Sequence, residues 1–220
     1  EDPGFGLTPA SGTAVATAGL FGMMVGALGM GWATDRFGRR RMLIGAVTIF
    51  SLLTLAMAFT DSIAVFGILR FLAGVGLGGC LPTAIAMVTE FSSGKAGKAS
   101  TRVMTGYHVG AVATALLGLV LLPLLGWRSM FWAGALPGFV LVPLMMRHLP
   151  ESPSFLLAKG RRDEALAVAR ANNLVLEPEA PTPTAEAAIS GSALFRAPFL
   201  RNSLGIWVTS FMGLLLVYAL

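Results

Sequence analysis

A short, highly charged segment between two long apolar stretches constrains the fold of this chain more than any other feature. The segment Gly31–Arg41 reads GWATDRFGRRR, and the apolar stretches are Ala14–Ala33 and Met42–Phe59. Each stretch has about the 20 residues that a helix rising about 1.5 Å per residue needs to cross about 30 Å of hydrocarbon. So short a connection makes the two helices antiparallel neighbours, and its arginines place it in the cytoplasm. We therefore expect a multi-pass protein of the inner membrane.

The composition supports a membrane protein, since 55% of the residues are hydrophobic and only 12% are charged. The net charge of +5 could indicate a nucleic-acid partner. The basic residues cluster at the ends of apolar stretches instead, so we expect no nucleic acid. Cys80 is the single cysteine, which excludes a disulfide framework and a cysteine metal site. We expect neither a metal nor a cofactor.

The apolar stretches predict five transmembrane helices, over about 13–34, 42–60, 63–90, 103–125 and 129–147. Residues 1–12 are polar and turn-rich, and we expect them outside the cytoplasm. A further apolar stretch begins near residue 203 and continues to residue 220. The chain starts at Glu1 rather than at Met, and its last stretch ends without a flanking charge. We expect an internal portion of a longer protein.

The basic residues fall on alternate connections between these helices. Fourteen of the 16 lysines and arginines lie on one set of connections, and the exceptions are Arg70 and Arg128. Cytoplasmic loops carry such an excess of positive charge. The bias therefore predicts that residues 35–41, 91–102 and 148–202 are cytoplasmic.

The long connection over 148–202 contains one predicted helix and one linker. Residues 154–171 have helical spacing, with Phe155, Leu156, Ala165, Leu166 and Val168 available for a buried face, and Asn172 and Asn173 suit the end of this helix. Residues 174–192 are rich in Pro, Glu, Ala and Thr, which predicts a flexible linker. A long polar connection of this kind is typical of a hinge between two membrane bundles.

The charged segment carries the spacing Gly31-x-x-x-Asp35-Arg36-x-Gly38-Arg39-Arg40. Asp35 can cap the next helix, and the arginines can pair with acids or with helix C-termini. Such a cluster can hold one conformation closed and release it in another. The alternative is a basic loop that only orients the chain. The preceding glycines, Gly22, Gly26 and Gly29, lie three or four residues apart, a spacing that lets a neighbouring helix approach closely.

This spacing resembles the loop signature between the second and third helices of the major facilitator superfamily. Arg70–Gly79 (RFLAGVGLGG) is similar to a pattern in the fourth helix of that superfamily, and Leu149–Leu156 (LPESPSFL) to the segment that closes its sixth helix. Leu81–Glu90 and Gly126–Phe131 are most similar to the aromatic acid:proton symporters, carriers of 4-hydroxybenzoate, benzoate and hydroxyphenylpropionate. The resemblance covers essentially the whole chain, as helices two to six, the central loop and the start of helix seven.

The resemblance implies an all-α membrane fold, present here in part, and a function in transport. The protein would import an aromatic carboxylate together with protons by alternating access, with the substrate between two six-helix halves in the lipid bilayer. The second half and the first-helix acidic motif that couples protons would lie outside this chain. The resemblance also implies that Gly31, Asp35, Arg36, Gly38, Arg39 and Arg40 form a cytoplasmic gate, with Glu90 paired to one of the arginines.

Arg70 is the strongest candidate for contact with substrate or for coupling. A charge within an apolar span is costly, so it faces a cavity or a partner by default, and a guanidinium suits a carboxylate. The alternative is an arginine that reaches the outer interface, since Arg70 lies only about 12 Å into its helix. Gly74, Gly76 and Gly79 match the dinucleotide fingerprint, but no strand precedes them, so we expect close helix packing.

Glu90 and His108 each allow two interpretations. Glu90 ends the predicted helix 63–90, where it either belongs to the gate or is a solvated acid at the interface. His108 lies about one turn into the helix 103–125. It either relays protons near neutral pH or is a helix-end histidine beside lipid headgroups.

Other functions fit less well. A transporter of a sugar, another organic acid or a drug would keep the fold and change the substrate. An intramembrane serine protease needs a serine in a glycine turn and a histidine base at membrane depth. The sequence Ser-Gly-Ser occurs only at 190–192, in the polar linker, so we expect no enzyme. A membrane scaffold without transport activity is the third alternative.

Overall fold

The computed structural model describes residues 8–92 and 96–174, and positions 200, 204, 205, 208, 209 and 212. The described part is helical with short connections and contains no strand. The chain divides into two compact units, residues 1–176 and 177–220. The first unit holds the helices α1 (Pro9–Phe37), α2 (Arg39–Met57), α3 (Ile63–Gly78), α4 (Cys80–Glu90), α5 (Ala96–Leu125), α6 (Arg128–His148), α7 (Pro153–Ala158) and α8 (Arg162–Ala171).

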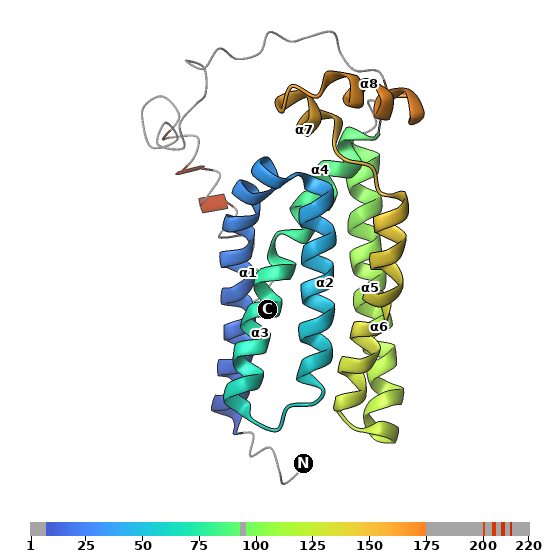
Figure 1. The fold of residues 1–220 in the computed structure, drawn as a ribbon. Helices are drawn as coiled ribbons and strands as arrows, with labels where there is room; N and C mark the ends of the chain where they lie inside the picture. Colours follow the sequence, from blue (N-terminus) through green and yellow to red (C-terminus); the bar gives the residue numbers. More distant parts are fainter. Residues whose placement is uncertain are drawn as a thin grey trace. The chain divides into compact units, whose positions relative to one another are not determined.

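Five helical segments of the described part are long and apolar enough to cross a membrane, with α3 and α4 together forming one span, Ile63–Glu90. Figure 1 shows these spans side by side, with α7 and α8 across one end. The expected all-helical, multi-pass membrane protein is therefore confirmed. Helices α1 and α2 extend into the charged segment, because backbone hydrogen bonding continues past the apolar residues.

Helices α1 and α3 pack through glycines on both sides. Gly22 and Gly26 of α1 lie against the carbonyl oxygens of Phe71 and Val75, so an added Cβ would overlap backbone. Gly74 and Gly78 of α3 lie in the same way against Gly19 and Met23 of α1. The two backbones therefore approach as closely as glycine permits. The sequence also predicted close helix packing at Gly29, and this was wrong, because its Cβ position has no neighbour within 4 Å.

The single helix predicted over 154–171 is wrong, because the structure has two helices there. Gly160 adopts a φ of 73°, and its amide and that of Arg161 each donate at 2.9 Å, to the carbonyls of Leu157 and Leu156. This hydrogen-bond pair with a left-handed glycine is the Schellman motif, which ends α7. Of the residues predicted for the buried face, Leu156 and Ala165 are buried, and Phe155, Leu166 and Val168 are half-buried. Ala169 is buried as well. Asn173 ends α8 with a φ of 53°.

Candidate functional site

The charged segment is almost entirely helical. Helix α1 continues through Asp35 to Phe37, and α2 starts at Arg39, so Gly38 alone joins them. Gly38 has a φ of 98°, which glycine adopts without strain, and a Cβ there would collide with the Glu151 carboxylate. Asp35 is exposed, and no side chain caps α2 from the Gly38 position. The prediction that Asp35 caps the next helix was wrong, because Asp35 belongs to the last turn of α1.

The acceptor for the start of α2 comes from a distant part of the chain. Glu151 Oε1 accepts the backbone N–H of Arg40 at 2.9 Å and that of Ser152 at 3.0 Å. One carboxylate oxygen therefore joins the first turn of α2 to the connection between α6 and α7. Glu151 was not predicted as a site residue. A signal was available, because Glu151 and Ser152 lie in Leu149–Leu156, the segment that resembles the close of the superfamily's sixth helix.

Arg39 and Glu90 form an ion pair between α2 and α4, with side chains 24% and 17% exposed. Ser152 donates its hydroxyl to Glu90 Oε2 at 2.5 Å. The same hydroxyl oxygen accepts the Phe155 amide at 3.1 Å and so caps the start of α7. Because Ser152 is fully buried, this pair of contacts ties α4 to α7 through a shielded hydroxyl. Glu90 is thus bound from two sides.

Arg40 makes a different contact from that of Arg39. Its Nη2 donates at 2.5 Å to the carbonyl of Met146 in the last turn of α6. Its Nε is buried and has no hydrogen-bond partner among the described residues. The Arg40 side chain thus contacts the end of α6, and the Arg40 backbone contacts the connection that follows α6. We call Arg39, Arg40, Glu90, Glu151 and Ser152 the charged cluster.

Arg36 lies outside the charged cluster. Its guanidinium carbon stands 5.5 Å from the ring centre of Trp32 and 5.9 Å from that of Phe37. Both distances suit cation–π contact. Arg36 is exposed, so the structure gives the three arginines of the predicted gate three different environments.

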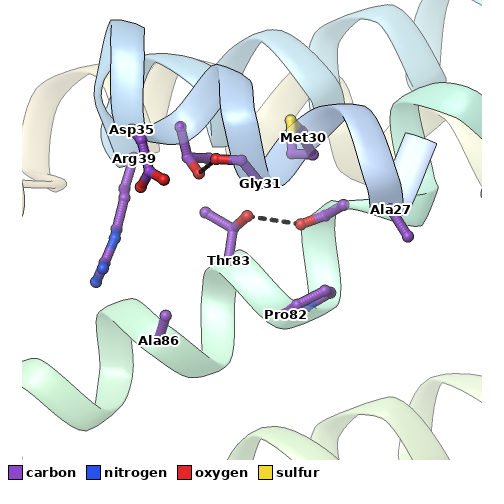
Figure 2. A pocket seen from close by; sticks show the side chains of 10 residues that line it. Ala27, Met30, Gly31, Asp35, Arg39, Pro82, Thr83 and Ala86 are labelled. Atoms are coloured by element: carbon purple, nitrogen blue, oxygen red, sulfur yellow. Dashed lines mark hydrogen bonds between the residues drawn. The ribbon is translucent and has the colours of Figure 1, made fainter. Parts of the chain in front are cut away.

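A cavity of about 200 Å³ lies beside the charged cluster, between α1 and α4. Figure 2 shows Asp35 and Arg39 on one side and Pro82, Thr83 and Ala86 of α4 on the other. The hydroxyls of Thr34 and Thr83 donate to carbonyls of their own helices, Gly31 at 2.8 Å and Gly79 at 2.7 Å. The polar character of the cavity therefore comes chiefly from Asp35 and Arg39. Its lining is Ala27, Met30, Gly31, Thr34, Asp35, Arg39, Gly79, Pro82, Thr83 and Ala86.

Arg70 lies well away from the charged cluster. It precedes Glu90 in the same membrane span by a length of helix of about 30 Å. The side chain is exposed on the first unit, and no carboxylate among the described residues pairs with it. Its stem lies against Gly19 of α1, whose Cβ position would be 3.1 Å from Arg70 Cγ. A guanidinium is thus presented on the surface of an apolar span.

His108 lies on an exposed face of α5, with its ring centre 5.4 Å from that of Tyr107. Within the described residues, nothing joins His108 to Arg70 or to the charged cluster. Those residues also contain no group of three His, Cys, Asp or Glu side chains that could hold a metal ion.

The opposite end of the first unit carries its own ion pair. Arg128, at the start of α6, pairs with Asp61 in the connection between α2 and α3. The Arg128 guanidinium also lies 4.5 Å from the ring centre of Trp127. The pair joins α6 to the α2–α3 connection at the end away from the charged cluster.

Comparison with known proteins gives consistent results. Residues 3–220 match the Major Facilitator Superfamily. The chain is 32% identical to the 4-hydroxybenzoate transporter PcaK of Pseudomonas aeruginosa, over 98% of this chain and 50% of that protein. It is 34% identical to a gallate transporter of Pseudomonas putida, over 97% of this chain and 49% of that protein. It is 40% identical to the 3-(3-hydroxy-phenyl)propionate transporter of Escherichia coli, over 63% of this chain and 34% of that protein.

Among solved structures, the chain resembles the proton:xylose symporter XylE bound to 6-bromo-6-deoxy-D-glucose. The TM-score is 0.67 at 22% identity, over 77% of this chain and 43% of that one. At this identity the likeness concerns the fold alone. The chain spans about half the length of the curated relatives it matches.

Proposed function

The chain belongs to the Major Facilitator Superfamily, and we propose that it forms part of an inner-membrane symporter that imports an aromatic carboxylate together with protons. In this proposal the charged cluster lies on the cytoplasmic side. The substrate binds between the bundle described here and a second six-helix bundle. Transport then alternates between outward and inward access.

The substrate class is suggested by what the relatives carry. Their names specify 4-hydroxybenzoate, benzoate, gallate and 3-(3-hydroxy-phenyl)propionate. All four compounds combine an aromatic ring with a carboxylate. A binding site for this class needs an apolar surface for the ring and one well-placed cation for the acid.

The observation that carries the proposal is the environment of Arg70. Its guanidinium is exposed on an otherwise apolar membrane span and pairs with no described carboxylate. A charge in such a span faces a cavity or a counter-ion by default, unless it reaches the outer interface. A carboxylate substrate supplies that counter-ion through two parallel hydrogen bonds to the planar guanidinium. Arg70 is therefore the proposed anchor for the acid group.

The charged cluster suits a gate because its contacts join three separate spans and α7. Opening the cytoplasmic side requires α4 to move relative to α2 or α7, and either motion breaks a bond to Glu90. The cavity between α1 and α4, lined by Gly31, Asp35 and Arg39, lies next to these bonds. We assign the gate to Arg39 and Glu90, and a supporting role to Arg40 and Glu151. His108 remains a proposed proton relay.

Uptake of labelled 4-hydroxybenzoate tests the function in cells that express the complete reading frame. We expect uptake that a protonophore abolishes and that Arg70→Ala removes, at normal levels of protein in the membrane. Arg170→Ala in α8, an exposed arginine, is the matched control and should transport normally. Well-expressed wild-type protein that takes up none of the four aromatic acids would exclude this substrate class.

A further inference from the structure

We propose that Gly19 is a positioning residue: it forms the surface on which the Arg70 side chain lies and so fixes the direction of the guanidinium. This inference rests on the proposed function of Arg70 in binding a carboxylate. Nothing in the sequence pattern distinguishes Gly19 from the other glycines of α1. The structure does, because Gly19 alone among the described glycines faces the Arg70 side chain.

The contact follows the length of the arginine stem. A Cβ at Gly19 would lie 3.1 Å from Cγ of Arg70, 3.6 Å from Cδ and 3.4 Å from Nε. Gly19 itself is buried, whereas Arg70 is exposed. The stem of Arg70 therefore lies flat across the α1 backbone and covers it. The guanidinium begins at the edge of this contact, where it is free to meet a ligand.

Gly74 brings the two helices together at this point. It lies one helical turn after Arg70, on the same face of α3, and packs against the carbonyl oxygen of Gly19. A side chain at position 74 would separate the backbones and remove the surface beneath Arg70. The Arg-x-x-x-Gly spacing of residues 70–74 thus has a physical reason: the glycine sets the distance at which the arginine meets α1.

This arrangement limits the directions that the guanidinium can take. Holding a flexible side chain in one orientation before binding reduces the entropy lost when the ligand binds. A methyl group at Gly19 would make a contact tighter than ordinary van der Waals distance, so the stem would shift by a few tenths of an ångström. The displaced guanidinium would hydrogen-bond less well to the carboxylate, and weakening about one such charge-assisted bond corresponds to an about tenfold loss of affinity.

The kinetic test compares two identical substitutions on one helix, in the complete protein. Gly19→Ala should raise the KM for 4-hydroxybenzoate uptake about tenfold, with the maximal rate per transporter close to wild type. Gly29→Ala is the control, since its Cβ would meet nothing within 4 Å. Its KM should stay at the wild-type value. An equal KM in both variants, or an unchanged KM in Gly19→Ala, would overturn the positioning role.

A second test needs no substrate. Arg70→Ala removes the three atoms nearest to the new methyl group. In that background Gly19→Ala should raise the melting temperature of the purified protein, as alanine for glycine does in an open helix position. With Arg70 present, the same substitution should lower it. Equal shifts in the two backgrounds would disprove the contact.

The two tests separate this inference from the proposed function. Wild-type protein that takes up no aromatic acid would refute the proposed substrate class. The melting comparison would still decide whether Gly19 supports Arg70. A clear melting difference combined with an unchanged KM would retain the contact and refute its role in binding.

Discussion

Glu151 illustrates how one side chain can connect two distant parts of the chain. Its Oε1 accepts the Arg40 and Ser152 amides, and Arg40 lies at the start of a helix with no local cap. We expect Glu151→Ala to lower the free energy of unfolding by about 1–3 kcal/mol, because both amides lose their acceptor in a partly buried place. Glu151→Gln keeps an acceptor oxygen and should have a much smaller effect. Thermal unfolding of the purified protein measures both.

Glu164 in α8 supplies the matched control. Its side chain is 57% exposed, and its carboxylate accepts hydrogen bonds from Arg161, which lowers the pKa of the carboxyl group. Exposed pairs contribute little to stability, so Glu164→Ala should change the melting temperature only slightly. Equal losses from Glu151→Ala and Glu164→Ala would contradict the capping role of Glu151.

The pair between Arg39 and Glu90 can be tested by exchanging the two charges. Arg39→Glu and Glu90→Arg each place two like charges together at a partly buried position, and each should abolish uptake. The double variant restores an attractive pair and should recover uptake in part. Recovery is incomplete because the Ser152 hydroxyl then lacks its carboxylate acceptor. A double variant as inactive as the single variants would argue against a direct functional pair.

At the scale of helices, the interface of α1 with α3 depends on four glycines that face backbone. Gly78→Ala would place a methyl group onto the Met23 carbonyl, and we expect a loss of about 1–3 kcal/mol through overpacking. Gly45→Ala in α2 meets nothing within 4 Å and should be neutral or slightly stabilising. Melting temperatures and the amount of protein in the membrane would show the difference. If both variants were as stable as the wild type, α1 and α3 could move apart without a loss of stability.

The presence of the helices was well predicted from the sequence, but the residues at which they end and the groups that cap them were predicted less well. Five spans followed from hydropathy, because a helix in lipid must satisfy its own backbone. The break between α7 and α8 was missed, although the polar run of residues 159–164 interrupts the apolar spacing and Gly160 within it marks the turn. The cap of α2 was assigned to Asp35, the nearest acid, whereas the structure uses Glu151. Such contacts depend on the fold as a whole and leave no local pattern.

At the scale of the whole molecule, the first unit has two chemically different ends. One end carries the charged cluster with α7 and α8, and the other carries the Asp61–Arg128 pair. Since cytoplasmic loops are enriched in lysine and arginine, we predict that the charged cluster faces the cytoplasm and that Asp61 faces outward. This predicted orientation rests on the distribution of charge alone. The pairing of Glu90 with an arginine was expected from the family resemblance and is confirmed by the Arg39–Glu90 pair, whereas the contacts of Glu151 and the Asp61–Arg128 pair were not predicted.

Cysteine labelling of the complete protein in intact cells tests this orientation. Ser62 and Lys159 are exposed at opposite ends, and each can be replaced by cysteine in a protein that otherwise lacks cysteine. A membrane-impermeant maleimide should label Ser62→Cys in intact cells and Lys159→Cys only after permeabilisation. Because both side chains are exposed, a difference in labelling reports the side of the membrane rather than burial. Labelling of Lys159→Cys in intact cells would reverse the predicted topology and place the proposed gate outside.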